Sequence, residues 1–136
     1  MTEILPNLWL GDAHAALDEN FMTKNGISIV INCTSDVEFL KTSIKLIQKR
    51  LQHVDVNGLN QVSKYMHEQL GKNNTILVHC KNCRFRAPAV VCGYLVRYGE
   101  MPANVAIKQL QSKCPGALKE LNDYTQHLYA LERLYV

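Results

Sequence analysis

One segment of the 136-residue chain, from Ile76 to Arg86, has the residue types and spacing for chemistry on phosphate. An apolar run that predicts a buried strand comes first, and a predicted helix follows. Backbone N–H groups at such a junction point into one cavity, and the helix dipole attracts anions to it. A cysteine at the entrance, Cys80, is expected to have a lowered thiol pKa. Arg86, six residues later, can bind two phosphate oxygens with its planar fork. The pattern predicts phosphoryl transfer to sulfur.

The elements that must position this loop alternate between strands and helices, which predicts one α/β domain over residues 1–136. Apolar runs predict strands over 4–10 (with a turn at Pro6-Asn7), 27–32, 51–56 and 76–78. Helical spacing and end signals, with Asn57-Gly58 as a turn, predict helices over 13–25, 59–71, 88–98, 102–114 and 118–135. The segment 34–50 is expected to hold a short helix or a turn. We expect no appended regulatory or targeting domain.

Composition excludes several classes of protein. Apolar residues make up 47% and charged residues 20%, the ordinary balance of a globular domain. The longest apolar stretches are too short to cross a membrane, which takes about 20 residues. The start of the chain lacks the pattern of a signal peptide, so we expect a cytoplasmic protein. The net charge of +3 fits an anionic substrate without requiring nucleic acid. In a reducing compartment, Cys33, Cys92 and Cys114 are expected to be small buried hydrophobes.

His79-Cys80-x5-Arg86 resembles the signature of cysteine-dependent protein phosphatases. The segment from Leu8 to Asp12 is similar to the family's opening strand and glycine, and the segment from Gly26 to Asn32 is similar to its second strand. Gln126-His127-Leu128 is similar to its closing helix. The resemblance covers nearly the whole chain and is closest to the small dual-specificity phosphatases, including compact forms carried by large DNA viruses. It implies a central, mostly parallel sheet flanked by helices, with the phosphate loop after strand 76–78. A viral member would act in the host cytoplasm or the virion.

The resemblance also implies roles for individual residues. Cys80 would be the nucleophile, and Arg86 would bind the phosphoryl oxygens. Asp55 would protonate the leaving group and then activate water, although matching the next helix to the family places it about one residue too early. No metal or other cofactor is implied. The residues expected to orient the loop or bind the substrate are His79, Lys81, Asn82, Cys83, Arg84 and Phe85. For Lys81 and Arg84, simple solvated charge is the competing interpretation.

Three positions of the loop depart from the family pattern. Cys83 replaces a usual glycine, Phe85 replaces a small residue, and Ala87 replaces the Ser or Thr whose hydroxyl helps the thiolate leave. These changes leave two alternatives. The first is a protein phosphatase that hydrolyses phosphotyrosine, and phosphoserine or phosphothreonine, through a phosphocysteine. The second is an impaired pseudophosphatase that binds a phosphorylated ligand or acts as a scaffold.

Other classes explain fewer residues. Cys80 and Cys83 form a C-x-x-C pair typical of thioredoxin-like proteins, which leaves His79 and Arg86 without a role. A zinc site lacks a second ligand pair. An RNA 5′-triphosphatase shares the signature, but the chain has no aromatic and basic platform for bases. We also consider two hypotheses, a reversible Cys80–Cys83 disulfide and a homodimer through the last helix, whose apolar stripe is better explained as core.

Overall fold

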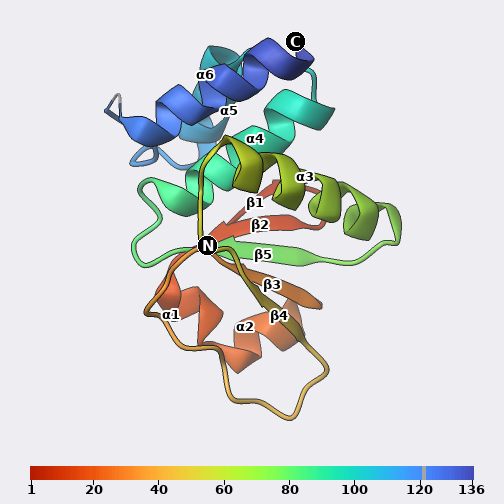
Figure 1. The fold of residues 1–136 in the computed structure, drawn as a ribbon. Helices are drawn as coiled ribbons and strands as arrows, with labels where there is room; N and C mark the ends of the chain where they lie inside the picture. The colour runs from red at the N-terminus through yellow and green to blue at the C-terminus, as the bar shows by residue number, and fades with distance from the viewer. Residues whose placement is uncertain (121) are drawn as a thin grey trace.

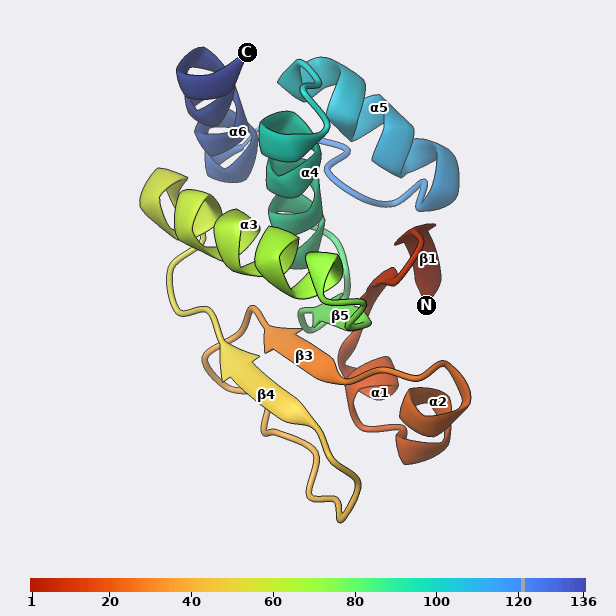
Figure 2. The same cartoon turned by 90° about the vertical axis from the view of Figure 1, so that its right-hand side faces the viewer.

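The computed structural model describes residues 1–120 and 122–136. A five-stranded sheet with the strand order β1-β2-β5-β3-β4 lies between two layers of helices (Figures 1 and 2). The strands are β1 (Thr2–Leu5), β2 (Leu8–Gly11), β3 (Ile29–Asn32), β4 (Ile47–Arg50) and β5 (Ile76–His79). β1 runs antiparallel to β2, and the other neighbouring strands are parallel. The predicted fold, a mostly parallel sheet flanked by helices, is confirmed.

The helices cover both faces of the sheet, with α1 and α2 on one face and the four longer helices on the other (Figure 1). They are α1 (Ala13–Ala16), α2 (Glu19–Lys24), α3 (Val56–Gly71), α4 (Arg86–Tyr98), α5 (Ala103–Lys113) and α6 (Asp123–Tyr135). Each face has its own apolar cluster, and the central strand β5 contributes to both. Ile76 and Val78 pack under the long helices, whereas Leu77 packs under α1 and α2. This alternation is the strand's period of two.

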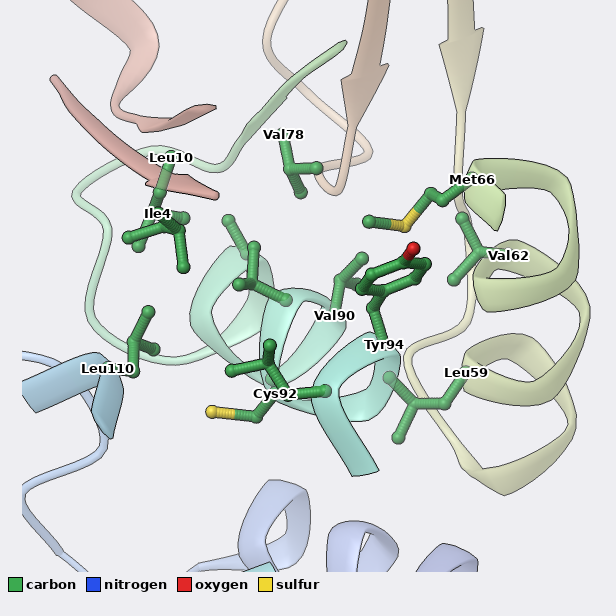
Figure 3. Packing of buried hydrophobic residues seen from close by; sticks show 14 of the residues in the cluster. Ile4, Leu10, Leu59, Val62, Met66, Val78, Val90, Cys92, Tyr94 and Leu110 are labelled. Atoms are coloured by element: carbon green, nitrogen blue, oxygen red, sulfur yellow. The ribbon is translucent and has the colours of Figure 1, made fainter. Parts of the chain in front are cut away.

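Helix α4 forms the centre of the larger cluster, where it packs against α3, α5 and α6 (Figure 2). Every residue from 87 to 96 is buried. Figure 3 shows Val90 and Tyr94 of α4 beside Met66 of α3, with Cys92 in the same core. Leu128 and Leu131 of α6 are also fully buried. The apolar stripe of the last helix therefore packs inside its own domain, and the prediction of a buried Cys92 is confirmed.

Several predicted boundaries are wrong, chiefly because short polar side chains end or begin helices. The helix predicted over 13–25 is broken into α1 and α2, since the Asp18 carboxylate accepts a hydrogen bond from Phe21 N at 3.0 Å and caps α2. The last helix starts at Asp123 after a capping box formed by Asn122 and Thr125. Leu118 lies before that helix, with a φ of 51°. Leu121, which falls within the helix predicted over 118–135, lies outside the described residues.

The segment around β4 and the start of α3 differs most from the prediction. The strand expected over 51–56 instead begins four residues earlier, as β4 (Ile47–Arg50). It pairs with β3. The predicted turn at Asn57-Gly58 lies in the first turn of α3, because the Asp55 carboxylate accepts from Gly58 N at 2.8 Å and begins the helix early. The predicted end of this helix at Gly71 is confirmed.

Gly58→Ala should destabilise the domain, whereas Gly71→Ala at the other end of α3 should not. A methyl group at Gly58 would lie 1.9 Å from the carbonyl oxygen of His53, so the segment that holds Asp55 must shift. Overpacking of this kind costs about 1–3 kcal/mol. At Gly71 the added carbon meets no described atom within 4 Å. Urea denaturation of both variants measures the difference, and equal free energies of unfolding would contradict this account.

Candidate active site

The carboxyl ends of the parallel strands meet at one edge of the sheet, where the predicted phosphate loop lies. Gly11 at the end of β2 and Asn32 at the end of β3 are both in register with His79 at the end of β5. The chain leaves β5 at Cys80 and enters α4 at Arg86. The predicted place of the loop is thus confirmed, at the edge where open α/β sheets bind their ligands.

The start of α4 is arranged to receive an anion. Phe85 is its N-cap residue, and no side chain in the described parts of the chain caps this helix. By contrast, Asp12 and Asp55 cap α1 and α3 with their carboxylates. An uncapped N-terminus of a 13-residue helix offers free N–H groups and the positive end of the dipole. Cys80, only 4% exposed, lies at the point where the strand turns into this loop.

A cavity of about 300 Å³ opens at this point, and four of the predicted loop residues line it together with Arg86. Its lining is Thr34, Ser35, Asp36, Cys80, Lys81, Asn82, Phe85, Arg86 and Tyr124. Cys83 and Arg84, which the sequence also suggested, do not line it, and Arg84 is exposed to solvent. The structure therefore brings the nucleophile candidate and the arginine into one cavity, with side chains that the sequence did not single out.

Cys83 holds the loop in a strained conformation. Its φ of 61° lies in the left-handed region, where glycine is favoured and a side chain is costly. Burial raises the pKa of the Cys83 thiol, and the neighbouring thiols of Cys114 and Cys80 raise it further. The loop is anchored further where Leu118 N donates to the carbonyl of Arg84 at 2.9 Å. The substitution of the family's glycine is thus accommodated by contacts outside the cavity.

Arg86 reaches from α4 to two distant parts of the chain. Its Nε donates to Tyr124 Oη at 3.1 Å, and its Nη1 donates to the Cys33 carbonyl at 3.5 Å. The hydrogen bond with Tyr124 raises the pKa of the Arg86 guanidinium. Cys33 is buried as predicted, and burial raises the pKa of its thiol, but its backbone contacts the site. Sequence reasoning missed Tyr124 because nothing local relates it to Arg86.

The loop after β3 forms another wall of the cavity. Asn32 accepts a hydrogen bond from Thr34 N at 2.9 Å and donates to the carbonyl of Val37 at 2.8 Å. Arg50 donates to the same Val37 carbonyl at 3.0 Å. These bonds hold the loop so that Asp36 lies at the cavity wall. The rule that sites form after the ends of parallel strands is the signal that could have found this loop.

Asp55 lies in an adjoining cavity and not in the one that contains Cys80. This second cavity, of about 380 Å³, is lined by Gln52, His53, Val54, Asp55, Arg86, Asn122, Asp123, Tyr124 and His127. Arg86 and Tyr124 line both cavities. The structure therefore places Asp55 and Cys80 in separate cavities that share Arg86 as a lining residue.

His79 is placed beneath the loop, outside the cavity. Its side chain is 1% exposed, and its Nδ1 finds no hydrogen-bond partner among residues 1–120 and 122–136. Burial lowers the pKa of the imidazole from its usual value. A neutral, buried histidine at this position can support the backbone of Cys80 but does not contact a ligand in the cavity.

The comparisons of this chain with known proteins all point to one protein family. Residues 8–134 match the family model described as the catalytic domain of dual specificity phosphatases. Mouse dual specificity protein phosphatase 13B is 27% identical over 139 residues, which cover 89% of this chain and 70% of that protein. The tyrosine-protein phosphatase vhp-1 of Caenorhabditis elegans is 28% identical over 131 residues, 90% of this chain but 20% of that protein. The chain thus spans only a fifth of this longer relative.

Solved structures show the same fold. Human DUSP28 superimposes with a TM-score of 0.89 at 22% identity, covering 98% of this chain and 96% of that one. A mouse putative dual specificity phosphatase, complexed with zinc tungstate, has a TM-score of 0.88 at 22% identity. The match covers 98% of this chain and 86% of that one. The human tyrosine phosphatase-like serine/threonine/tyrosine-interacting protein has a TM-score of 0.86 at 18% identity. The match covers 98% of this chain and 96% of that one. At these identities the likeness concerns the fold alone.

The burial of His79 predicts a pH dependence of stability. Because its pKa is lower in the folded state than in the unfolded chain, the unfolded state takes up the proton first below about pH 6.5. His79 thus contributes its full stability above that pH and loses it as the pH falls through the folded-state pKa.

We expect the free energy of unfolding to fall less between about pH 7.5 and 5.5 in His79→Gln than in wild type. His14→Gln, which replaces an exposed imidazole on α1, is the control and should follow wild type. Urea denaturation at each pH gives the slopes. Identical slopes for wild type and His79→Gln would contradict the assignment.

Proposed function

The chain belongs to the dual-specificity phosphatase family, since the family's catalytic domain spans residues 8–134, and we propose that it hydrolyses phosphotyrosine, phosphoserine and phosphothreonine in proteins through a phosphocysteine on Cys80. The observation that carries the proposal is the cavity that joins Cys80, Arg86 and the start of α4, which no side chain of the described residues caps. The pseudophosphatase alternative is not favoured, because the family model and the curated relatives are those of phosphatases.

In the proposed first step, the phosphoryl group lies in the Cys80 cavity. The thiolate of Cys80 attacks phosphorus, the bond from phosphorus to the substrate oxygen breaks, and a sulfur–phosphorus bond forms. The free N–H groups of α4 and the Arg86 guanidinium stabilise the charge on the phosphoryl oxygens. Because these donors are fixed before the substrate arrives, little reorganisation opposes the reaction.

The leaving oxygen needs a proton, which we assign to Asp55. This assignment requires the substrate oxygen to point toward the second cavity, which Asp55 and Arg86 both line. In the second step Asp55 accepts a proton from water, the water oxygen bonds to phosphorus, and the sulfur–phosphorus bond breaks to release phosphate and the Cys80 thiolate. Asp36 is the competing candidate, since its carboxylate lines the Cys80 cavity itself.

We infer a reducing compartment, the cytoplasm, for this activity. All five cysteines, each within the described residues, are free thiols, as reducing conditions would keep them. Among the described residues no helix is both long and apolar enough to cross a membrane. A phosphorylated protein is the proposed partner. Neither nucleic acid nor a metal has a part in the proposed mechanism.

Hydrolysis of two aryl phosphates tests the nucleophile and the acid together. Cys80→Ser should abolish turnover of p-nitrophenyl phosphate and phenyl phosphate. Asp55→Asn should lower kcat on phenyl phosphate about a hundredfold, since phenolate leaves poorly without a proton. The same variant should affect p-nitrophenyl phosphate far less, because nitrophenolate is a good leaving group. Steady-state kinetics with both substrates measures the ratio of wild-type to variant kcat for each.

Asparagine also caps helices, so the Asp55→Asn variant retains the start of α3. Asp18→Asn is the matched control, because Asp18 caps α2 in the same way and lines neither cavity. It should leave both rates unchanged. If Asp36→Asn, and not Asp55→Asn, shows the dependence on leaving group, the acid is Asp36 and our assignment is wrong. Activity that survives Cys80→Ser would overturn the mechanism.

Ala87→Ser should raise the turnover number if breakdown of the phosphocysteine limits the rate. Ala87 is fully buried in the first turn of α4, next to Arg86, where a hydroxyl could donate to the departing sulfur. Stopped-flow kinetics with p-nitrophenyl phosphate should show a smaller burst and a faster steady state. Ala89→Ser places the same hydroxyl at another fully buried position of α4 and should give no increase. An unchanged or lower kcat in Ala87→Ser would count against a slow second step.

A further inference from the structure

Tyr124 contacts the candidate catalytic arginine from outside the phosphate loop. Its Oη accepts the hydrogen bond from Arg86 Nε at 3.1 Å. Its ring stacks on Phe85, the residue before Arg86, with 6.3 Å between centroids and 19° between ring planes. The same side chain lines both cavities. Tyr124 therefore touches Arg86 at the wall between the proposed phosphoryl site and the proposed acid.

We propose that Tyr124 is the positioning residue that holds Arg86 ready for the phosphoryl group. This inference rests on the proposed function. Arginine has one of the most flexible side chains, and fixing it before the substrate binds removes an entropic cost from binding. Tyr124 engages Nε and the Cys33 carbonyl engages Nη1. Nη2 has no hydrogen-bond partner among residues 1–120 and 122–136, so its N–H groups can bind phosphoryl oxygens.

Both partners of this hydrogen bond are on rigid supports. Tyr124 is the second residue of α6 and lies inside the capping box, in which Asn122 N donates to Thr125 Oγ1 at 2.9 Å and Thr125 N donates to Asn122 Oδ1 at 3.1 Å. Arg86 is the first residue of α4. The two helices pack against each other in the larger apolar cluster (Figure 2). The packing of α6 on α4 thus determines where the phenol meets the guanidinium.

Tyr124→Phe isolates the phenol oxygen, because it keeps the ring that stacks on Phe85. The probe is tungstate, a tetrahedral oxyanion whose binding by titration calorimetry needs no turnover. We expect tungstate to bind about five- to tenfold more weakly, as for the loss of a hydrogen bond to a charged group near solvent. On p-nitrophenyl phosphate kcat/KM should fall by a similar factor, mainly through KM. A merely structural role would lower stability without this shift.

Tyr135→Phe is the matched control. It removes a phenol hydroxyl from the same helix, where the group donates to Asn60 Oδ1 and lines neither cavity. Tungstate affinity should stay at the wild-type value. An equal loss in Tyr135→Phe would overturn the proposal, because it would trace the effect to α6 as a whole.

Tungstate that binds Tyr124→Phe as tightly as wild type, or more tightly, would also overturn the proposal. Tighter binding would mean that the phenol competes with the oxyanion for Arg86. If wild type binds tungstate but hydrolyses no aryl phosphate, the proposed catalysis fails, whereas the positioning role is still decided by the comparison of tungstate affinities.

Discussion

The site depends on one constraint, the burial of α4. Its residues 87 to 96 are all inside the core, so the helix cannot shift or fray when its first turn is left without a side-chain cap among the described residues. A missing cap costs a typical helix about 1 kcal/mol. Here the apolar contacts of the helix offset that cost. The free N–H groups then remain directed at a cavity beside Cys80, where an anion can satisfy them.

Other locally destabilising features lie around the same loop. Cys83 has a left-handed φ of 61°, and the buried Nδ1 of His79 lacks a partner among the described residues. Strain of this kind persists only where the surroundings enforce it. One anchor is the hydrogen bond that Leu118 N donates to the carbonyl of Arg84.

Arg86 links the two halves of the proposed chemistry. It lines the cavity of the nucleophile and the cavity of Asp55, with Tyr124 at the wall between them. With Asp55 as the proposed acid, the substrate would place its phosphoryl group in the Cys80 cavity and direct its leaving oxygen toward the second cavity. The separate placement of Asp55 follows from its role as the cap of α3, which ties its carboxylate to Gly58. The position of this candidate acid and the start of a helix are thus one structural feature.

The sequence by itself determined the parts of this protein that neighbouring residues control. Apolar periodicity and end signals predicted the buried strand β5, the helix after it, and Cys80 and Arg86 at the junction, because strand, loop and helix start follow from local backbone preferences. Tertiary structure alone decided which distant groups meet them. Tyr124 lies 38 residues from Arg86, and the carbonyl of Cys33 lies 53 residues away. Such contacts depend on how α6 and the β3 loop pack, which no local pattern encodes.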